Sequence, residues 1–202
     1  MEKLRIGLIG LSAKTTPPES GVICAPNDIL YQLAESLSKR GHLVTIFTGK
    51  GSKAILPIES CDLGSTWQEY GPDYVNPLLF TQKRAEYDLI LSSRAIELYK
   101  QKKLDIIHAI DYRVSPYLFD SSNTPVIYTV HGDFENCSSP YDKHRFSMLT
   151  NSNFYFTNIS SKNNKFCALN RLQSLGITPN GIDQNLYKFN QSGRDGLLLV
   201  AR

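Results

Sequence analysis

The chain has 202 residues, of which 41% are hydrophobic and 20% charged, proportions that are ordinary for a globular protein. The formal net charge of +3 is too small, and basic runs such as "KQKK" at 100–103 are too short, to indicate a nucleic-acid-binding protein. No apolar stretch has the length of a membrane span, and no signal-peptide cleavage site follows the run at 6–11, so we expect a cytoplasmic protein. A weak attraction to an anionic membrane surface stays open as an alternative.

The first part of the chain predicts a strand, a helix and a second strand. "LRIGLIG" at 4–10 is a short apolar run that ends in glycine, which is typical of a buried strand. After a loop rich in turn residues, the apolar spacing predicts a helix that Asn27 caps and Gly41 ends. "LVTIFT" at 43–48 predicts the next strand. The region 49–76 is less regular, with "KAILPI" and "CDLGSTWQEY" as candidate short strands.

The remaining elements continue this alternation. Asn76 and Pro77 form a cap and first position for a long helix, and apolar runs predict strands at 104–110, 124–130 and 153–159. Residues 160–176 predict a helix that starts at a serine cap and ends at Gly176. The alternation indicates an α/β fold: a Rossmann-like, mostly parallel sheet with right-handed crossovers and helices on both faces.

Ligands of such sheets bind beyond the carboxyl ends of the strands. Four segments follow predicted strands: the loop after Gly10, the turn at 111–113, the turn at 131–133 and the helix start at 160–162, whose free N–H groups could hold an anion. His131 ends an apolar strand and precedes Gly132, which allows close approach of a ligand, so a functional role is favoured there. His108 lies inside a strand, where a hydrogen-bonded core histidine is favoured over a ligand-binding one.

Several other chemistries are disfavoured. The cysteines, Cys24, Cys61, Cys137 and Cys167, are far apart and form no CxxC pair, so neither a zinc site nor a redox motif is indicated and all four are expected to be reduced. Nothing orients Cys137 and His131 as a nucleophilic pair. The "GLIG" at 7–10 lacks the G-x-G-x-x-G spacing and no acidic residue ends the second strand, which makes a dehydrogenase improbable.

Four stretches resemble a known family. "LSKRGHLVTIFTGKGS", "LDIIHAIDYRVSPYL", "TPVIYTVHGDFE" and "TPNGIDQNLYKF" are similar to segments of the N-terminal half of glycosyltransferase family 4, whose members have the GT-B fold. The closing "GLLLVAR" resembles the first strand of that family's donor-binding domain, and Arg202 matches an arginine that holds the donor pyrophosphate. The resemblance implies a glycosyltransferase-like domain at 1–190, followed at 191–202 by a linker and the first strand of a missing C-terminal domain.

The resemblance also implies a chemistry. It suggests half of a retaining, hexosyltransferase-like enzyme that moves a sugar from a nucleoside-diphosphate sugar to an unknown acceptor without a metal. His131 would contact the transferred sugar, and the loop at 11–26 would approach the donor phosphates and the acceptor. Donor contacts would come from Ala25, Gly132 and Arg202, and the acceptor side from Asp111, Tyr112 and Arg113. By itself the chain would bind no cofactor and would be inactive.

Some positions depart from the family pattern. Cys24 and Ala25 stand where a glycine pair is usual, Asp28 replaces an arginine, and Ala201 replaces the glycine before Arg202. A carboxylate at Asp28 would repel a pyrophosphate. The alternative is therefore a non-catalytic remnant that binds a glycan or a protein. The expected partners are a sugar acceptor (a glycan, lipid or small molecule), with self-association through the bared inter-domain face as a further alternative.

Overall fold

The computed structural model describes residues 2–20, 22–73, 75–110, 115–131, 139–150 and 153–181. The strands are β1 (Arg5–Ile9), β2 (Leu43–Phe47), β3 (Ile58–Glu59), β4 (Ile106–Ala109), β5 (Val126–Val130), β6 (Phe154–Asn158) and β7 (Ser174–Ile177). The helices are α1 (Ala25–Lys39), α2 (Thr66–Tyr70), α3 (Pro77–Lys100), α4 (Ser115–Ser122), α5 (Pro140–Leu149) and α6 (Ser161–Leu169). None of these helices is long and apolar enough to cross a membrane.

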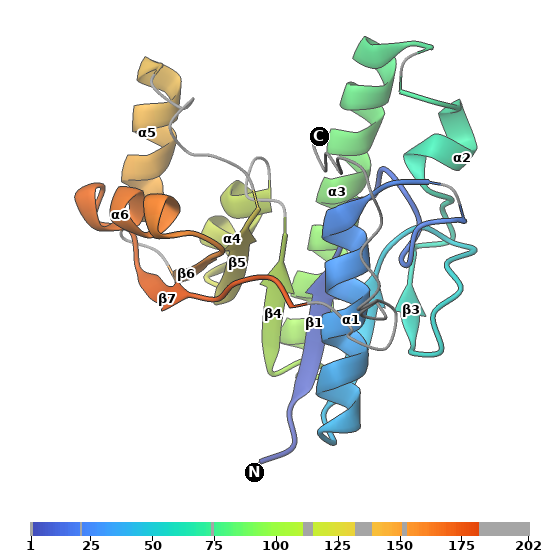
Figure 1. Cartoon of the computed structure of the whole chain (residues 1–202), viewed down its shortest axis with the longest axis horizontal. Coiled ribbons are helices and arrows are strands. Elements are labelled where there is room, and N and C mark those ends of the chain that lie inside the picture. The colour runs from blue at the N-terminus through green and yellow to red at the C-terminus, as the bar shows by residue number, and fades with distance from the viewer. Residues whose placement is uncertain are drawn as a thin grey trace, which may run out of the picture.

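The strands form one sheet in the order β3-β2-β1-β4-β5-β6-β7, and every neighbouring pair is parallel. Helices connect most of these parallel strands (Figure 1). The predicted α/β, Rossmann-like fold is therefore confirmed. Because all strands are parallel, the segments that follow β1, β4 and β5 meet along one edge of the sheet.

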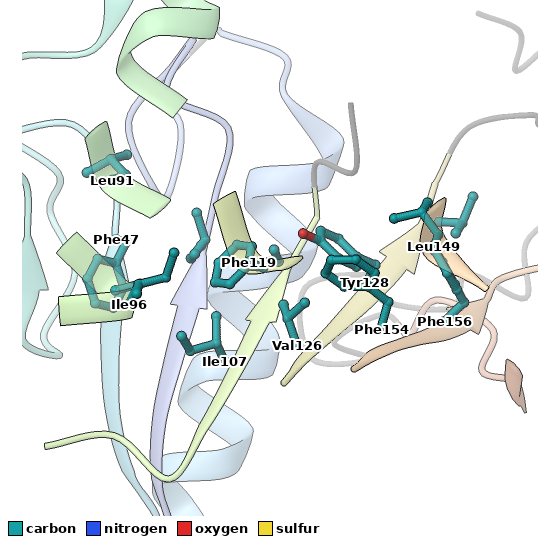
Figure 2. Packing of buried hydrophobic residues seen from close by; sticks show 14 of the residues in the cluster. Phe47, Leu91, Ile96, Ile107, Phe119, Val126, Tyr128, Leu149, Phe154 and Phe156 are labelled. Atoms are coloured by element: carbon teal, nitrogen blue, oxygen red, sulfur yellow. The ribbon is translucent and has the colours of Figure 1, made fainter. Parts of the chain in front are cut away.

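Two hydrophobic clusters lie on the two faces of the sheet. On one face, α1 contributes Leu30 and Ala34 to a cluster with Leu8 and Ile46 from β1 and β2. On the other face, α3 to α6 and their connections cover a larger cluster that spans the strands from β2 to β6. Aromatic side chains dominate its β5–β6 end (Figure 2): Phe119, Tyr128, Phe154 and Phe156 are all fully buried. This division confirms helices on both faces.

The α1 face is covered unevenly. The side chains that β5 and β6 present there, including Ile127, Thr129 and Thr157, are only half-buried, whereas their neighbours on the opposite face are buried. Among the described residues, α1 is the helix that contributes to the cluster on this face, over β1 and β2. Within the ranges that the structure describes, no helix therefore packs over the floor made by β4 to β6 on this side.

The structure corrects the predicted elements at two places. "TWQEY" is the helix α2 and not a strand, because Ser65 and Gln68 form a capping box in which Ser65 Oγ accepts from the Gln68 N–H. The helix predicted over 160–176 does begin at the Ser160 cap, but it ends at Leu169. Arg171 then adopts a φ of 58°. The edge strand β7 follows at Ser174–Ile177, where Gly176 has a φ of 117° and the pairing shows a register irregularity between Phe156 and Thr157. The two short helices α4 and α5 were not predicted.

Candidate functional site

The loop after β1 lies at the carboxyl edge of the sheet and is held by one buried amide. Asn27 Oδ1 accepts from the Leu11 N–H at 2.9 Å, and its Nδ2 donates to the carbonyl oxygens of Leu11, Lys14 and Thr15 at 3.0, 3.2 and 3.1 Å. The sequence predicted Asn27 as a helix cap, but it lies inside α1, fully buried. Its bonds fix the loop and not the helix end.

Other elements hold the same loop from the opposite side. Asp88 of α3 accepts from the Ser12 N–H at 3.0 Å, and the Thr66 N–H of α2 donates to the Ser12 carbonyl at 2.9 Å. Thr16 and Thr48 join their hydroxyls at 2.9 Å. At Gly10 an added Cβ would lie 3.2 Å from both Leu30 Cδ2 and Thr16 Oγ1, so glycine allows the loop to pack closely on α1. The loop at this edge is therefore a fixed platform.

Lys14 places a cation on this platform. Its ammonium lies over the ring of Trp67 in α2, and its buried Nζ has no hydrogen-bond partner within the described part of the chain. Burial lowers the pKa of this lysine, while the charges of Asp73 and Glu19 act in the opposite direction. A buried ammonium that makes no hydrogen bond is suited to receive an anionic or strongly polar ligand.

The start of α1 lies directly after this loop. Cys24 is the N-cap but provides no side-chain capping bond, and half-buried Ala25 is the first helical residue. Burial raises the pKa of the Cys24 thiol, so this cysteine is protonated at neutral pH. Burial also raises the pKa of Asp28 in the first turn. Cys61 and Cys167 are free thiols as well, and Cys137 lies outside the described residues.

His131 is the first residue after β5 and is half-buried at the same edge. Burial lowers its pKa, which favours the neutral imidazole. His108 lies in β4 with Nε2 2.6 Å from Thr129 Oγ1, so the predicted hydrogen-bonded core histidine is observed. Burial, with a contribution from the charge of His131, lowers the pKa of His108 to about 4. Burial therefore favours the neutral form of both histidines near pH 7.

A cavity of about 810 Å³ has His108 in its lining. One wall is α1 from Ile29 to Lys39, the floor is formed by β4, β5 and β6 through His108, Ile127, Thr129 and Thr157, and the far wall is Leu175 with 178–181. This cavity was not predicted, because it forms between α1 and strands β4 to β6, which are distant from α1 in the chain.

The structure describes two of the predicted site residues. His131 directly follows β5, and Ala25 is the first residue of α1. Both lie toward the carboxyl edge of the sheet. Gly132, Asp111, Tyr112, Arg113 and Arg202 lie outside the described residues, as does the expected domain boundary at 190/191. The helix start at 160–162 is capped by the Ser160 side chain, which accepts from the Asn163 N–H. Asn27, Asp88, Lys14 and Thr129 were not predicted as site residues.

Comparison with known proteins adds to this geometry. A family model described as Glycosyltransferase Family 4 matches residues 28–163, about two-thirds of the chain. Among solved structures the chain is similar to HepE of Anabaena in complex with UDP-glucose, with a TM-score of 0.54, 14% identity, and coverage of 93% of this chain and 47% of that one. It is also similar to the catalytic domain of starch synthase IV from Arabidopsis thaliana bound to ADP and acarbose, with a TM-score of 0.50, 17% identity, and coverage of 91% and 53%.

At these identities the likeness to solved structures shows the fold. The chain spans about half the length of each of the two. No curated protein matches its sequence.

Proposed function

Since the chain belongs to glycosyltransferase family 4, we propose that it is the acceptor-side half of an enzyme that moves a sugar from a nucleoside-diphosphate sugar to an acceptor. The observation that carries this proposal is the carboxyl edge of the sheet. A fixed loop bearing Lys14, the start of α1 and a neutral His131 all lie there. This is where open α/β sheets bind their ligands.

His131 would contact the transferred sugar. A neutral imidazole can both donate to and accept from sugar hydroxyls, and it does not repel the positive charge that develops on a sugar ring as its bond to phosphate breaks. Burial favours this neutral form. In the proposed reaction the configuration at the transferred carbon is retained, and closing of a second domain over this edge excludes water.

The donor phosphates would lie near the loop and the start of α1. The ammonium of Lys14 and the positive end of the α1 helix dipole supply positive charge there. Support also comes from the relatives, because HepE was crystallised with UDP-glucose and starch synthase IV with ADP. Contacts from Gly132 and Arg202 remain predictions.

Asp28 favours a second candidate function. It places a carboxyl group in the first turn of α1, and burial raises the pKa of this group. When ionised, the carboxylate would repel a neighbouring diphosphate. A domain that has lost the donor contact would keep the fold and bind a glycan without transferring a sugar. This non-catalytic function predicts glycan binding with no nucleotide release.

The test compares the 202-residue chain with a fusion of residues 1–190 to the donor-binding half of HepE. Nucleotide release from UDP-glucose and ADP-glucose is measured in the presence of simple glycosides. The chain alone should match a blank without enzyme, and the fusion should release nucleotide. A fusion that folds and binds UDP-glucose but releases none would contradict the catalytic proposal and favour the binding one. Turnover by the chain alone would show that this half needs no donor domain.

A further inference from the structure

The cavity beside α1 is large enough for a small molecule. Its volume of about 810 Å³ lies within the range of pockets that bind drug-sized ligands, about 300 to 1,000 Å³. It lies between α1 and the half-buried floor of β4 to β6, and the segment after β7 closes its far side. His108 and Thr129 line this floor, and His131 comes two residues after Thr129 at the carboxyl edge, so the cavity adjoins the proposed reaction site.

The part of the floor nearest the carboxyl edge is rich in hydroxyl groups. Thr129 and Thr157 are register partners on β5 and β6, and Thr157 Oγ1 donates to Thr178 Oγ1 at 2.8 Å. At the other end of this row, His108 Nε2 forms a hydrogen bond with Thr129 Oγ1. His131 follows Thr129 by two residues, just past the end of β5, and two residues of extended chain span roughly 7 Å, which is close to the length of one sugar ring.

The rest of the cavity is mainly apolar. Ile29 and Leu33 of α1 form one side, Ile127 lies on the floor, and Leu175 and Pro179 form the other side. Leu175 is 59% exposed, which is a high value for a leucine in a strand. The charged side chains in the lining are Glu35 and Lys39, which lie 4.0 Å apart and offset each other's charge. The lining therefore suits a neutral molecule.

The strands differ from those of a sheet covered on both faces. Parallel strands between two helix layers are almost continuously apolar. β5 instead alternates Val126, Tyr128 and Val130 on the buried face with Ile127 and Thr129 on the open one. On the open face, the apolar Ile127 is followed toward the carboxyl edge by the hydroxyl of Thr129. This order matches a molecule that is apolar at one end and hydroxylated at the other.

From this pattern we infer that the acceptor is a neutral glycolipid-like molecule: its hydroxylated head lies between the threonine row and His131, and its apolar tail lies in the cavity beside α1. This inference rests on the proposed function, because it names the acceptor of that site. The tail contacts Leu33, Ile127 and Leu175, and its far end leaves past Glu35 and Lys39.

The experiment titrates the 202-residue chain with n-octyl β-D-glucopyranoside and with methyl β-D-glucopyranoside by isothermal calorimetry. The octyl glycoside is kept below its critical micelle concentration. The two probes share the sugar and differ in the tail, so the difference in Kd measures the tail contact. The octyl glycoside should bind at least about tenfold more tightly, because burial of its methylene groups is favourable. Equal Kd values for the two glycosides would overturn the inference.

Two leucines on neighbouring elements provide matched variants. Leu175→Asp puts a carboxylate in the cavity wall, whereas Leu169→Asp changes an 84%-exposed leucine at the end of α6 outside the cavity. Leu175→Asp should weaken octyl glycoside binding at least tenfold and Leu169→Asp should leave it unchanged. Equal losses in both variants would show non-specific binding of the tail and would also overturn the inference.

A third variant tests the head of the ligand. Thr129→Val keeps the shape of the side chain and removes its hydroxyl, so it should weaken both glycosides by a similar factor, about threefold to tenfold. Loss of octyl glycoside binding alone would contradict the placement of the head.

The titrations contain no donor, so they separate this inference from the proposed function. Tight octyl glycoside binding together with a fusion that transfers no sugar would refute the proposed function only. Transfer to methyl glucoside without tail-dependent binding would refute the glycolipid inference only.

Discussion

The two faces of β5 and β6 differ in burial, although the same two strands of five residues each form both faces. Toward α4, α5 and α6, the two strands present Val126, Tyr128, Phe154 and Phe156, all almost fully buried. Toward α1 they present half-buried side chains, among them Thr129 and Thr157. One face provides stability, and the other is only half-buried by the residues that the structure describes.

This contrast shows how a strand can serve two purposes at once. Because successive side chains point to opposite faces, a hydroxyl can be placed on the open side without changing the buried side. The aromatic rings of Tyr128 and Phe156 stack 5.9 Å apart, directly beneath the threonine row. A rigid core thereby holds the floor of the cavity in place.

The largest effect should come from the buried face. Phe156→Ala removes a fully buried ring and should lower the free energy of unfolding by about 3 to 5 kcal/mol. Its neighbour Thr157→Ala, on the open face, should cost less than about 1 kcal/mol. Urea denaturation of both variants measures the difference. Similar losses for the two would contradict the division between a stabilising and an open face.

A second effect concerns the helix that borders the open face. Asn27→Ala leaves one N–H and three carbonyl groups of the loop without their buried partner, and should destabilise the fold by about 2 to 3 kcal/mol. Asn76→Ala serves as the control, because it removes one exposed cap bond to Leu79 N–H and should cost about 1 kcal/mol. Thermal or urea unfolding measures both. An equal cost would show that the loop is not fixed by Asn27.

A third effect is the pH dependence that His108 confers on stability. Its pKa is lowered to about 4, mainly by burial, whereas an unfolded chain has an ordinary value near 6.5. Between these values the unfolded state binds the proton and the folded state does not, so stability is complete above pH 6.5 and falls as the pH drops toward 4. The loss from this group between pH 7 and pH 4.5 should be about 2.5 kcal/mol.

The control for this prediction is His108→Asn, which removes the titrating group. Its unfolding free energy should fall less between pH 7 and pH 4.5 than that of the original chain. His131 has a pKa lowered by burial and acts in the same direction in both proteins. Identical pH profiles would mean that His108 is accessible to protons in the folded state.

The smallest effect concerns the end of the open face, at His131. In the fusion with a donor domain, His131→Ala should lower turnover by at least about tenfold, or roughly 1.4 kcal/mol of barrier stabilisation. Because His131 is only half-buried, the unfolding free energy should change little. Initial rates of nucleotide release and urea denaturation are measured on the same preparations. Unchanged turnover with lowered stability would assign His131 a structural role.

Much of the fold could be predicted from the sequence, because local patterns determine it. The strands at 4–10, 43–48, 104–110, 124–130 and 153–159 are apolar runs, and their positions agree with β1, β2, β4, β5 and β6 to within two residues at each end. Asn76 does cap α3, with its Oδ1 accepting from the Leu79 N–H at 3.2 Å. These features depend on contacts between residues that are near in sequence.

The errors occurred where distant contacts decide the structure. Asn27 has the residue type of a helix cap, but it lies inside α1. Its side chain forms hydrogen bonds with a loop that is more than ten residues away in sequence. β7 is a four-residue segment that contains Ser174 and Gly176, so its pattern did not predict a strand, and pairing with β6 creates it. The cavity beside α1 could not be predicted for the same reason, whereas His131 was found because it directly follows an apolar strand.

The two edge strands also bear on how the protein behaves at high concentration. β3 has two residues, and β7 is short, twisted by Gly176 and irregular in its pairing with Thr157. Such edges offer a second chain few aligned backbone groups, so they discourage the strand-to-strand association that leads to aggregates. The sheet can therefore leave part of one face open to ligands while both of its margins remain poor templates for polymerisation.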